Sequence, residues 1–157
     1  MFGFGKKKNG INGQKELEEL EKRVAKNDVK AMVELANLYS EGKIVGPTIE
    51  SCLKTAFELY KLAAVQGDAK AQDKLGTFYY YGYSGIKSIK EAEKWFKLAA
   101  EQGIANAQFM MGQIYGIFAM NAMEANDFDG MNKWTEASEK WYKLAADQGH
   151  ADARNFL

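Results

Sequence analysis

A seven-residue tract, Lys-Leu-Ala-Ala-x-Gln-Gly, occurs three times in this chain, at residues 61–67, 97–103 and 143–149. An alanine follows four residues after each final glycine. Six identical positions in three copies indicate an array of repeats. Because a single repeat cannot bury its own apolar face, its copies must stack on one another.

The copies also align outside the tract, at small and apolar positions that recur every three to four residues. The first half of the repeat carries Ala31, Ala71, Ala107 and Ala153, then Leu35, Leu75 and Met111, then Tyr39, Tyr79 and Tyr115. The second half carries Leu59, Trp95 and Trp141. This spacing is typical of helices rather than strands. The sequence therefore predicts an all-α fold, an α-solenoid of stacked antiparallel helical hairpins.

Glycine follows the last turn of each second helix, at positions 67, 103 and 149. A residue in the left-handed region commonly closes a helix, and glycine enters that region without steric cost. Asn27 has the matching place ahead of the first full repeat, so residues 14–27 are interpreted as a capping half-repeat. Ser88 and Glu91 fit a capping box, which predicts that a helix begins there.

These signals divide the chain into a disordered N-terminal tail (1–13) and one solenoid domain (14–157). The domain comprises the cap, repeat 1 (28–67), repeat 2 (68–103), repeat 3 (104–149) with a loop insertion, and the start of a fourth repeat or a C-terminal cap (150–157). The repeats are expected to differ in their loops and not in their helices. The insertion adds apolar residues that extend a helix, cover their own repeat or form a binding lip: Phe118, Met120, Met123, Phe128, Met131 and Trp134.

The composition favours neither nucleic acid nor a membrane as the partner. Lysine plus arginine equal aspartate plus glutamate, 21 each, and no apolar run reaches the length of a spanning helix. The basic run at residues 6–8 is interpreted as part of a solvated tail. A single cysteine, Cys52, excludes an internal disulfide and favours the cytoplasm.

The sequence offers no constellation of catalytic residues, and we predict that the protein is not an enzyme. Its one histidine, His150, is expected at the surface, and Cys52 is expected to be a packed or half-exposed structural thiol. Asp127 and Asp129 lack the later ligands of a calcium loop and are interpreted as a turn. No metal and no cofactor are predicted.

The repeat resembles the Sel-one-like repeat (SLR), a relative of the tetratricopeptide repeat. The resemblance rests on Ala-x-x-x-Leu-Gly-x-x-Tyr in the first helix and on Ala-x-x-Trp-Phe-Lys-Leu-Ala-Ala-x-Gln-Gly in the second, which repeat 2 matches nearly completely. It implies a scaffold or adaptor that binds a protein or peptide. Cysteine-rich bacterial members of the family imply an alternative, a binder of small ligands or cell-wall fragments with weak hydrolytic activity. This chain lacks their cysteines.

In tetratricopeptide-like hairpins the first helix of each repeat lines the concave face. The positions opposite the Leu/Gly/Tyr set are therefore expected to be exposed and to contact a partner, with the alternative that Tyr80 and Phe109 pad adjacent helices. They are Lys30, Val33 and Asn37 in repeat 1, Lys70, Asp73, Thr77, Tyr80 and Tyr81 in repeat 2, and Asn106, Phe109 and Gln113 in repeat 3. Among them, Lys30, Asn37 and Lys70 resemble a carboxylate clamp for a peptide terminus.

Overall fold

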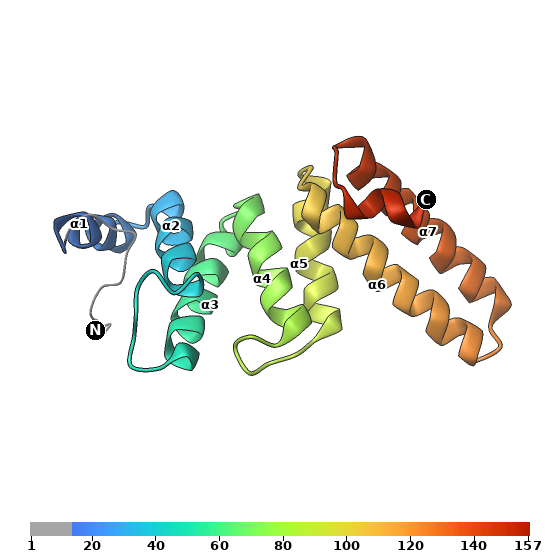
Figure 1. Cartoon of the computed structure of the whole chain (residues 1–157), viewed down its shortest axis with the longest axis horizontal. Helices are drawn as coiled ribbons and strands as arrows, with labels where there is room; N and C mark the ends of the chain where they lie inside the picture. Colours follow the sequence, from blue (N-terminus) through green and yellow to red (C-terminus); the bar gives the residue numbers. More distant parts are fainter. Residues whose placement is uncertain (1–13) are drawn as a thin grey trace. The chain divides into compact units, whose positions relative to one another are not determined.

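The computed structural model describes residues 14–157, so the predicted tail at 1–13 lies outside the described residues. Within 14–157 the chain forms α-helices, one short 3-10 helix and no strand (Figure 1). The helices are α1 (Gln14–Ala25), α2 (Val29–Ser40), α3 (Ile49–Val65), α4 (Ala69–Tyr81), α5 (Ile89–Glu101), α6 (Ala105–Glu124), α7 (Phe128–Asp147) and η1 (Asp152–Phe156). They fall into two compact units, Met1–Lys87 and Ser88–Leu157.

The first unit contains α1 to α4, with α2 and α3 paired as an antiparallel hairpin (Figure 1). Asp28 and Asp68 begin α2 and α4, because each side chain accepts a hydrogen bond from the N–H three residues later. Thr48 and Ser51 form a reciprocal capping box at the start of α3. Tyr60 and Leu75 are fully buried at the centre of this unit.

The predicted glycine closures are confirmed. Gly67, Gly103 and Gly149 have φ of 92°, 87° and 86°, and Asn27 has φ of 65° in the equivalent place. At each closure a backbone N–H returns to the helix it leaves, as from Asp68 to the carbonyl of Ala63. The recurrent glycines therefore mark the same helix-ending geometry in every copy.

A buried glutamine side chain adds a hydrogen bond at two of these helix closures. Gln72 Nε2 donates to the carbonyl of Ala64 at 3.2 Å in the first unit. Gln108 Nε2 donates to the carbonyl of Ala100, also at 3.2 Å, in the second. Each bond ties the first helix of one repeat to the last turn of the helix before it, and it is a second bond to an end carbonyl that also accepts the N–H of the closing glycine.

The second unit contains α5, α6, α7 and η1. The predicted start of α5 is confirmed, since Ser88 Oγ accepts the N–H of Glu91 at 3.2 Å. The long inter-helix loop predicted for repeat 3 is wrong. The extra residues lengthen both helices, so that α6 and α7 have 20 residues each, against 13 each for α4 and α5. Only residues 125–127 separate α6 from α7.

The α6–α7 hairpin packs closely at Gly112. A Cβ atom at this position would lie 2.7 Å from Cδ1 and Cε1 of Tyr142. The Gly112 carbonyl also accepts a 2.7 Å hydrogen bond from Ser138 Oγ. This glycine is repeated at Gly76, and at Gly112 the structure shows why a side chain does not fit.

Candidate interaction surface

The predicted partner-binding residues divide into exposed and buried sets. Lys30, Lys70, Tyr81 and Asn106 are exposed, and Val33, Asn37, Thr77, Tyr80 and Gln113 are half-buried. Asp73 and Phe109 are buried. A partner can therefore reach the first set directly, whereas Asp73 and Phe109 serve the interior.

The expectation that Phe109 is an exposed anchor is wrong. Its side chain is 9% exposed, stacks on His150 with ring centroids 4.5 Å apart, and contacts Tyr142 and Phe156. Phe156 in turn stacks on Tyr142 at 4.7 Å. Residues 150–157 fold back as η1 and cover Phe109, so the alternative that this ring packs against its neighbours is confirmed.

Asn37 belongs to a hydrogen-bonded group within the α2–α3 hairpin. The hydroxyl of the buried Tyr60 donates to Asn37 Oδ1 at 2.7 Å and lies 3.0 Å from Ser40 Oγ. Burial raises the pKa of Tyr60. The Asn37 oxygen is held by Tyr60, which leaves its NH2 group for the clamp expected with Lys30 and Lys70. That clamp stays a prediction.

Among residues 14–87, the most exposed aromatic side chains lie at the end of α4 and just after it. Tyr81 and Tyr83 are 53% and 48% exposed, and their rings stack 5.3 Å apart with an interplanar angle of 17°. Tyr80 meets Tyr81 edge-on at 5.0 Å, and burial raises the pKa of Tyr80. We call Tyr80, Tyr81 and Tyr83 the tyrosine patch.

Tyr83 is not among the predicted partner-binding residues, although the sequence carries a local signal for it. Gly82 ends α4 with φ of 75°, a left-handed conformation that turns the chain back and brings Tyr83 beside Tyr81. The ring of Tyr83 also packs edge-on against the buried Phe78 at 5.6 Å. The run Tyr-Tyr-Tyr-Gly-Tyr, with its glycine in the fourth place, was the available clue.

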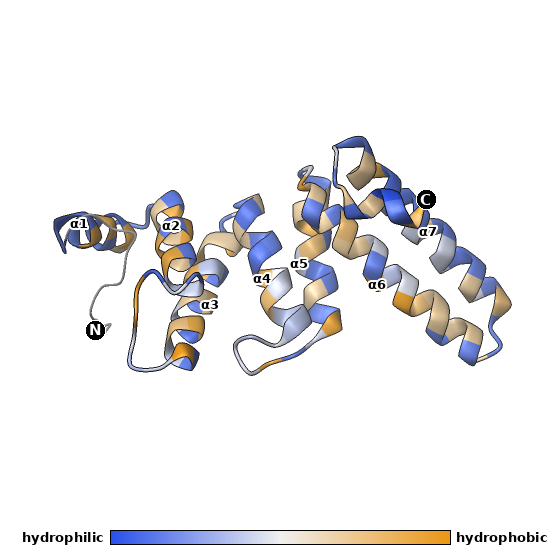
Figure 2. Ribbon diagram, viewed as in Figure 1, coloured by the Kyte–Doolittle hydropathy of each residue, from blue (hydrophilic) through white to orange (hydrophobic). Residues whose placement is uncertain are grey.

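The insertion of repeat 3 covers its own hairpin and also exposes part of its apolar surface. Tyr115, Phe118 and Trp134 pack against one another with centroid separations of 5.2 to 6.0 Å. Apolar colours dominate the C-terminal half of α6 (Figure 2). Near the turn into α7, Met120, Met123 and Phe128 are more than half exposed.

Cys52 and His150, the two residues considered as candidates for catalysis, both lie in packed surroundings. The Cys52 sulfur is buried and accepts the N–H of Gly46 at 3.0 Å, in agreement with the expected structural thiol. His150 is half-buried against Phe109, so the expected surface histidine is wrong. Its Nδ1 is buried and has no hydrogen-bond partner in the described part of the chain.

The acidic turn of the insertion is a helix start. Asp127 caps α7, and its carboxylate accepts the N–H of Gly130 at 2.9 Å. Among residues 14–157 no group of three or more histidine, cysteine, aspartate or glutamate side chains is placed to hold a metal ion. In the same range no helix combines the length and the apolar character needed to cross a membrane.

A family model and one curated protein are similar to this chain. The model of the Sel1 repeat matches residues 29–68, 69–104, 105–120 and 135–150, which make up more than half of the chain. Chitin synthase regulatory factor 3 of Schizosaccharomyces pombe is 39% identical over 82 residues, which are 52% of this chain and 9% of that protein. The chain thus spans less than a tenth of this curated relative.

Two solved structures share the fold. A Sel1 repeat protein from Oxalobacter formigenes superposes with a TM-score of 0.64 at 26% identity, over 90% of this chain and 96% of that one. A protective antigen of uropathogenic Escherichia coli that displays an SLR fold gives a TM-score of 0.54 at 26% identity, over 93% of this chain and 35% of that one. These neighbours confirm the predicted all-α repeat fold of the solenoid class.

Proposed function

Because the chain belongs to the Sel1 repeat family, whose members generally mediate protein–protein interaction, we propose that it is an adaptor that binds a protein or peptide through the tyrosine patch. The observation that carries the proposal is the stacked, half-exposed pair Tyr81 and Tyr83. Tyrosine is enriched among the residues that dominate binding energy at interfaces, since it offers a large apolar ring and a polar hydroxyl.

The patch is held in place before a partner arrives. Tyr83 rests on the buried Phe78, and Tyr80 meets Tyr81 edge-on. Rings that are already ordered lose little rotamer freedom on binding, which favours affinity. An isolated tyrosine on a flexible loop would not have this advantage.

The rest of α4 suits an extended peptide. Lys70, Thr77 and Tyr81 follow one another at spacings of seven and four residues, which places them on one side of the helix. Lys70 and Tyr81 are eleven positions apart and are therefore separated by about 16 Å along the helix axis, at 1.5 Å per residue. About five residues of extended chain cover that distance. We infer that an apolar side chain of the peptide meets the tyrosine patch while an acidic group approaches Lys70.

The curated relative supports a regulatory rather than a catalytic role. That protein is a chitin synthase regulatory factor, but the short shared segment carries nothing of its target to this chain. The cytoplasm remains our proposed compartment, on the ground of the single buried thiol of Cys52.

Affinity capture with the full chain and with Tyr81→Ala/Tyr83→Ala as a second bait identifies proteins that depend on the patch. Calorimetry with the purified partner then measures the affinity. We expect the double variant to weaken binding by at least about thirtyfold, because a buried aromatic anchor often contributes about 2 kcal/mol or more. Phe128→Ala, which removes an aromatic side chain of similar exposure, serves as the matched control and should bind normally.

Equal affinity of the double variant and the natural chain, with the fold intact by circular dichroism, would remove the patch from the interaction. The cell-wall alternative is tested in the same calorimeter with a soluble muropeptide. Saturable binding of that probe, abolished by the tyrosine variant, would replace the protein partner by a cell-wall fragment.

A further inference from the structure

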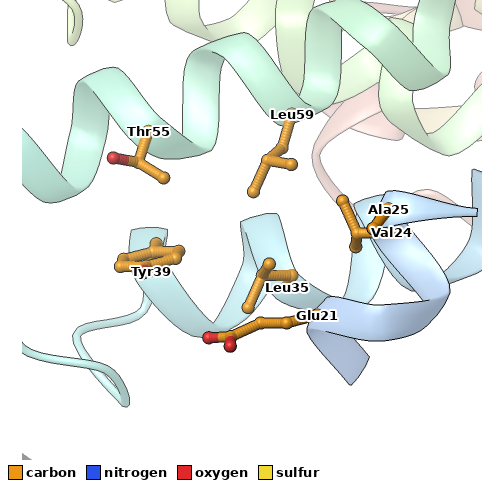
Figure 3. Close-up of a pocket in the computed structure, with 7 residues that line it drawn as sticks. All are labelled: Glu21, Val24, Ala25, Leu35, Tyr39, Thr55 and Leu59. Atoms are coloured by element: carbon orange, nitrogen blue, oxygen red, sulfur yellow. The ribbon is translucent and has the colours of Figure 1, made fainter. Parts of the chain in front are cut away.

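Two apolar surfaces of the chain differ in the charges around them. One is a pocket of about 160 Å³ where α1 meets the α2–α3 hairpin, with Val24, Leu35 and Leu59 in its lining (Figure 3). Its walls are almost entirely apolar, so it selects no particular occupant. The other lies at the end of the α6–α7 hairpin, where exposed apolar side chains stand beside exposed carboxylates. Only this second surface selects an occupant by charge.

The end of the α6–α7 hairpin extends beyond the helix that supports its first half. α5 runs antiparallel to α6 and has 13 residues, against 20 in α6. An equal length measured from Ala105 ends at Ile117, and Figure 1 shows α6 and α7 continuing together away from α5. Residues 118–124 therefore form about two helical turns that pack on α7 past the end of α5.

The apolar side chains at this end are exposed and rest on an ordered base. Met120, Met123 and Phe128 are each more than half exposed. The rings of Phe118 and Trp134 pack edge-on with centroids 5.4 Å apart and hold the two helices together there. Methionine is unbranched and adapts its shape to a bound side chain, which suits a surface that receives a partner.

The same end of the hairpin is negatively charged. From residue 98 to residue 132 the sequence contains no lysine or arginine, although these make up 21 of its 157 residues. The turn carries Glu124, Asp127 and Asp129, all exposed. Asp127 caps α7, whereas Glu124 and Asp129 make no ion pair within residues 14–157. Lys133, the next base, lies over a tryptophan ring. This charge favours a cationic partner.

We propose that this surface, which we call the hairpin tip (Met120, Met123, Glu124, Phe128 and Asp129), binds an amphipathic helix of a partner protein. The helix carries lysine or arginine beside its apolar face. Its apolar side chains contact the two methionines and the phenylalanine, and its bases approach the two carboxylates. A helix is the fitting occupant because α5 already packs on the first half of α6, and a further helix continues that packing over residues 118–124.

The charge of the hairpin tip also argues against two other occupants. A second copy docked tip to tip would bring the carboxylates of both copies together, and like charges placed side by side oppose binding. An anionic membrane surface would meet the same repulsion. The hairpin tip shares no residue with the tyrosine patch, so the proposal adds a second site and does not depend on the first.

The test titrates the full chain, with isotope-labelled methionine methyl groups, with the amphipathic peptide acetyl-KLKKLLKKLKKLLKK-amide. We expect saturable NMR shifts of the methyl signals of Met120 and Met123, while Met32 in the first unit stays unchanged. The dissociation constant should be on the order of 100 µM, because a short peptide must become helical as it binds.

Two changes to the peptide test the chemistry of the occupant. Glutamine in place of every lysine keeps the leucines and removes the charge. Proline in place of the central leucine keeps the charge and breaks the helix. Each change should weaken binding at least about tenfold, because the first removes the pairing with the carboxylates and the second removes the continuous apolar face.

Two double variants of the chain test the site by calorimetry with the lysine peptide. Met120→Gln/Met123→Gln removes apolar surface and keeps the helix propensity. Glu124→Gln/Asp129→Asn removes the unpaired charges and leaves the Asp127 cap in place. Each double variant should bind at least about tenfold more weakly than the natural chain, with its helix content unchanged by circular dichroism.

Matched controls carry the same kinds of change elsewhere. Leu62→Gln/Val65→Gln removes exposed apolar side chains of α3, and Glu139→Gln/Asp147→Asn removes exposed carboxylates farther along α7. Both should bind the lysine peptide as the natural chain does. Tyr81→Ala/Tyr83→Ala should also bind it normally, so failure of the tyrosine patch and failure of the hairpin tip are distinguishable.

Several results would overturn the proposal. Equal binding of the glutamine peptide would remove the preference for charge, and equal binding of the proline peptide would assign an extended occupant. Binding at least about tenfold tighter after the lysines at 6–8 are changed to serine would assign the hairpin tip to the chain's own basic run. Self-association in the ultracentrifuge that Met120→Gln/Met123→Gln abolishes would assign it to a second copy.

Discussion

Gly112 lies against the ring of Tyr142, and the missing side chain is what lets α6 and α7 pack there. In Gly112→Ala the new methyl group would meet the ring at 2.7 Å. Overpacking typically costs roughly 1–3 kcal/mol, which outweighs the gain of up to about 1 kcal/mol in helix propensity. We expect a lower free energy of unfolding in urea.

Gly116→Ala is the matched control on the same helix. Its Cβ would lie 3.7 Å from Ser138 Oγ, an ordinary contact. This variant gains the propensity without the clash and should be more stable by up to about 1 kcal/mol. If both variants were equally stabilised, the ring of Tyr142 would not restrain position 112.

Glu21 should make the stability of the chain depend on pH. Its pKa in the folded protein is raised above the ordinary value of 4.5, so the folded state favours the neutral carboxyl group. Stability from this group is therefore fully present below pH 4.5 and is lost as the pH rises through the folded pKa. At neutral pH Glu21→Gln should be more stable by a few tenths of a kcal/mol, a small effect because solvent screens the partly exposed side chain.

The measurement compares urea unfolding of Glu21→Gln and the natural chain at neutral pH and below pH 4. The difference should vanish in acid, where both side chains are neutral. Glu58→Gln, which removes a carboxylate from an exposed position of α3, is the matched control. A gain that persists unchanged in acid would mean that the charge of Glu21 is not its cause.

At the scale of elements, the features that the sequence predicted are those with local causes. A glycine with positive φ closes a helix whatever lies around it, and Ser88 caps α5 with a bond that spans three residues. The all-α fold and the start of α5 could therefore be predicted from short patterns. Repetition made the prediction stronger, because each copy repeats the same local signals.

The features that the sequence did not predict depend on contacts between distant residues. Phe109 is buried because η1 returns over it, which no pattern within α6 reveals. The insertion became two longer helices because Tyr115, Phe118 and Trp134 pack together across the hairpin. The candidate site was predicted at Tyr80 and Tyr81, while Tyr83 joins them only through the turn at Gly82.

At the scale of the whole molecule, the stabilising contacts described above stay within one compact unit. The hydrogen bond from Gln72 to the Ala64 carbonyl lies in the first unit, and the hydrogen bond from Gln108 to the Ala100 carbonyl lies in the second. In repeat proteins the stability is approximately a sum of repeat and nearest-neighbour contributions. Changes that act on separate contacts should therefore add.

Glu21→Gln and Gly112→Ala test this additivity, because each residue packs against its own unit. The change in unfolding free energy of the double variant should equal the sum of the single changes within about 0.5 kcal/mol. Urea unfolding is followed by circular dichroism, which reports all helices, and by tryptophan fluorescence. Fluorescence reports the second unit alone, since Trp95, Trp134 and Trp141 all lie there. A coupling energy above about 1 kcal/mol by either probe would show that the two sites share a structural response, and the stability could then not be treated as a sum of local contributions.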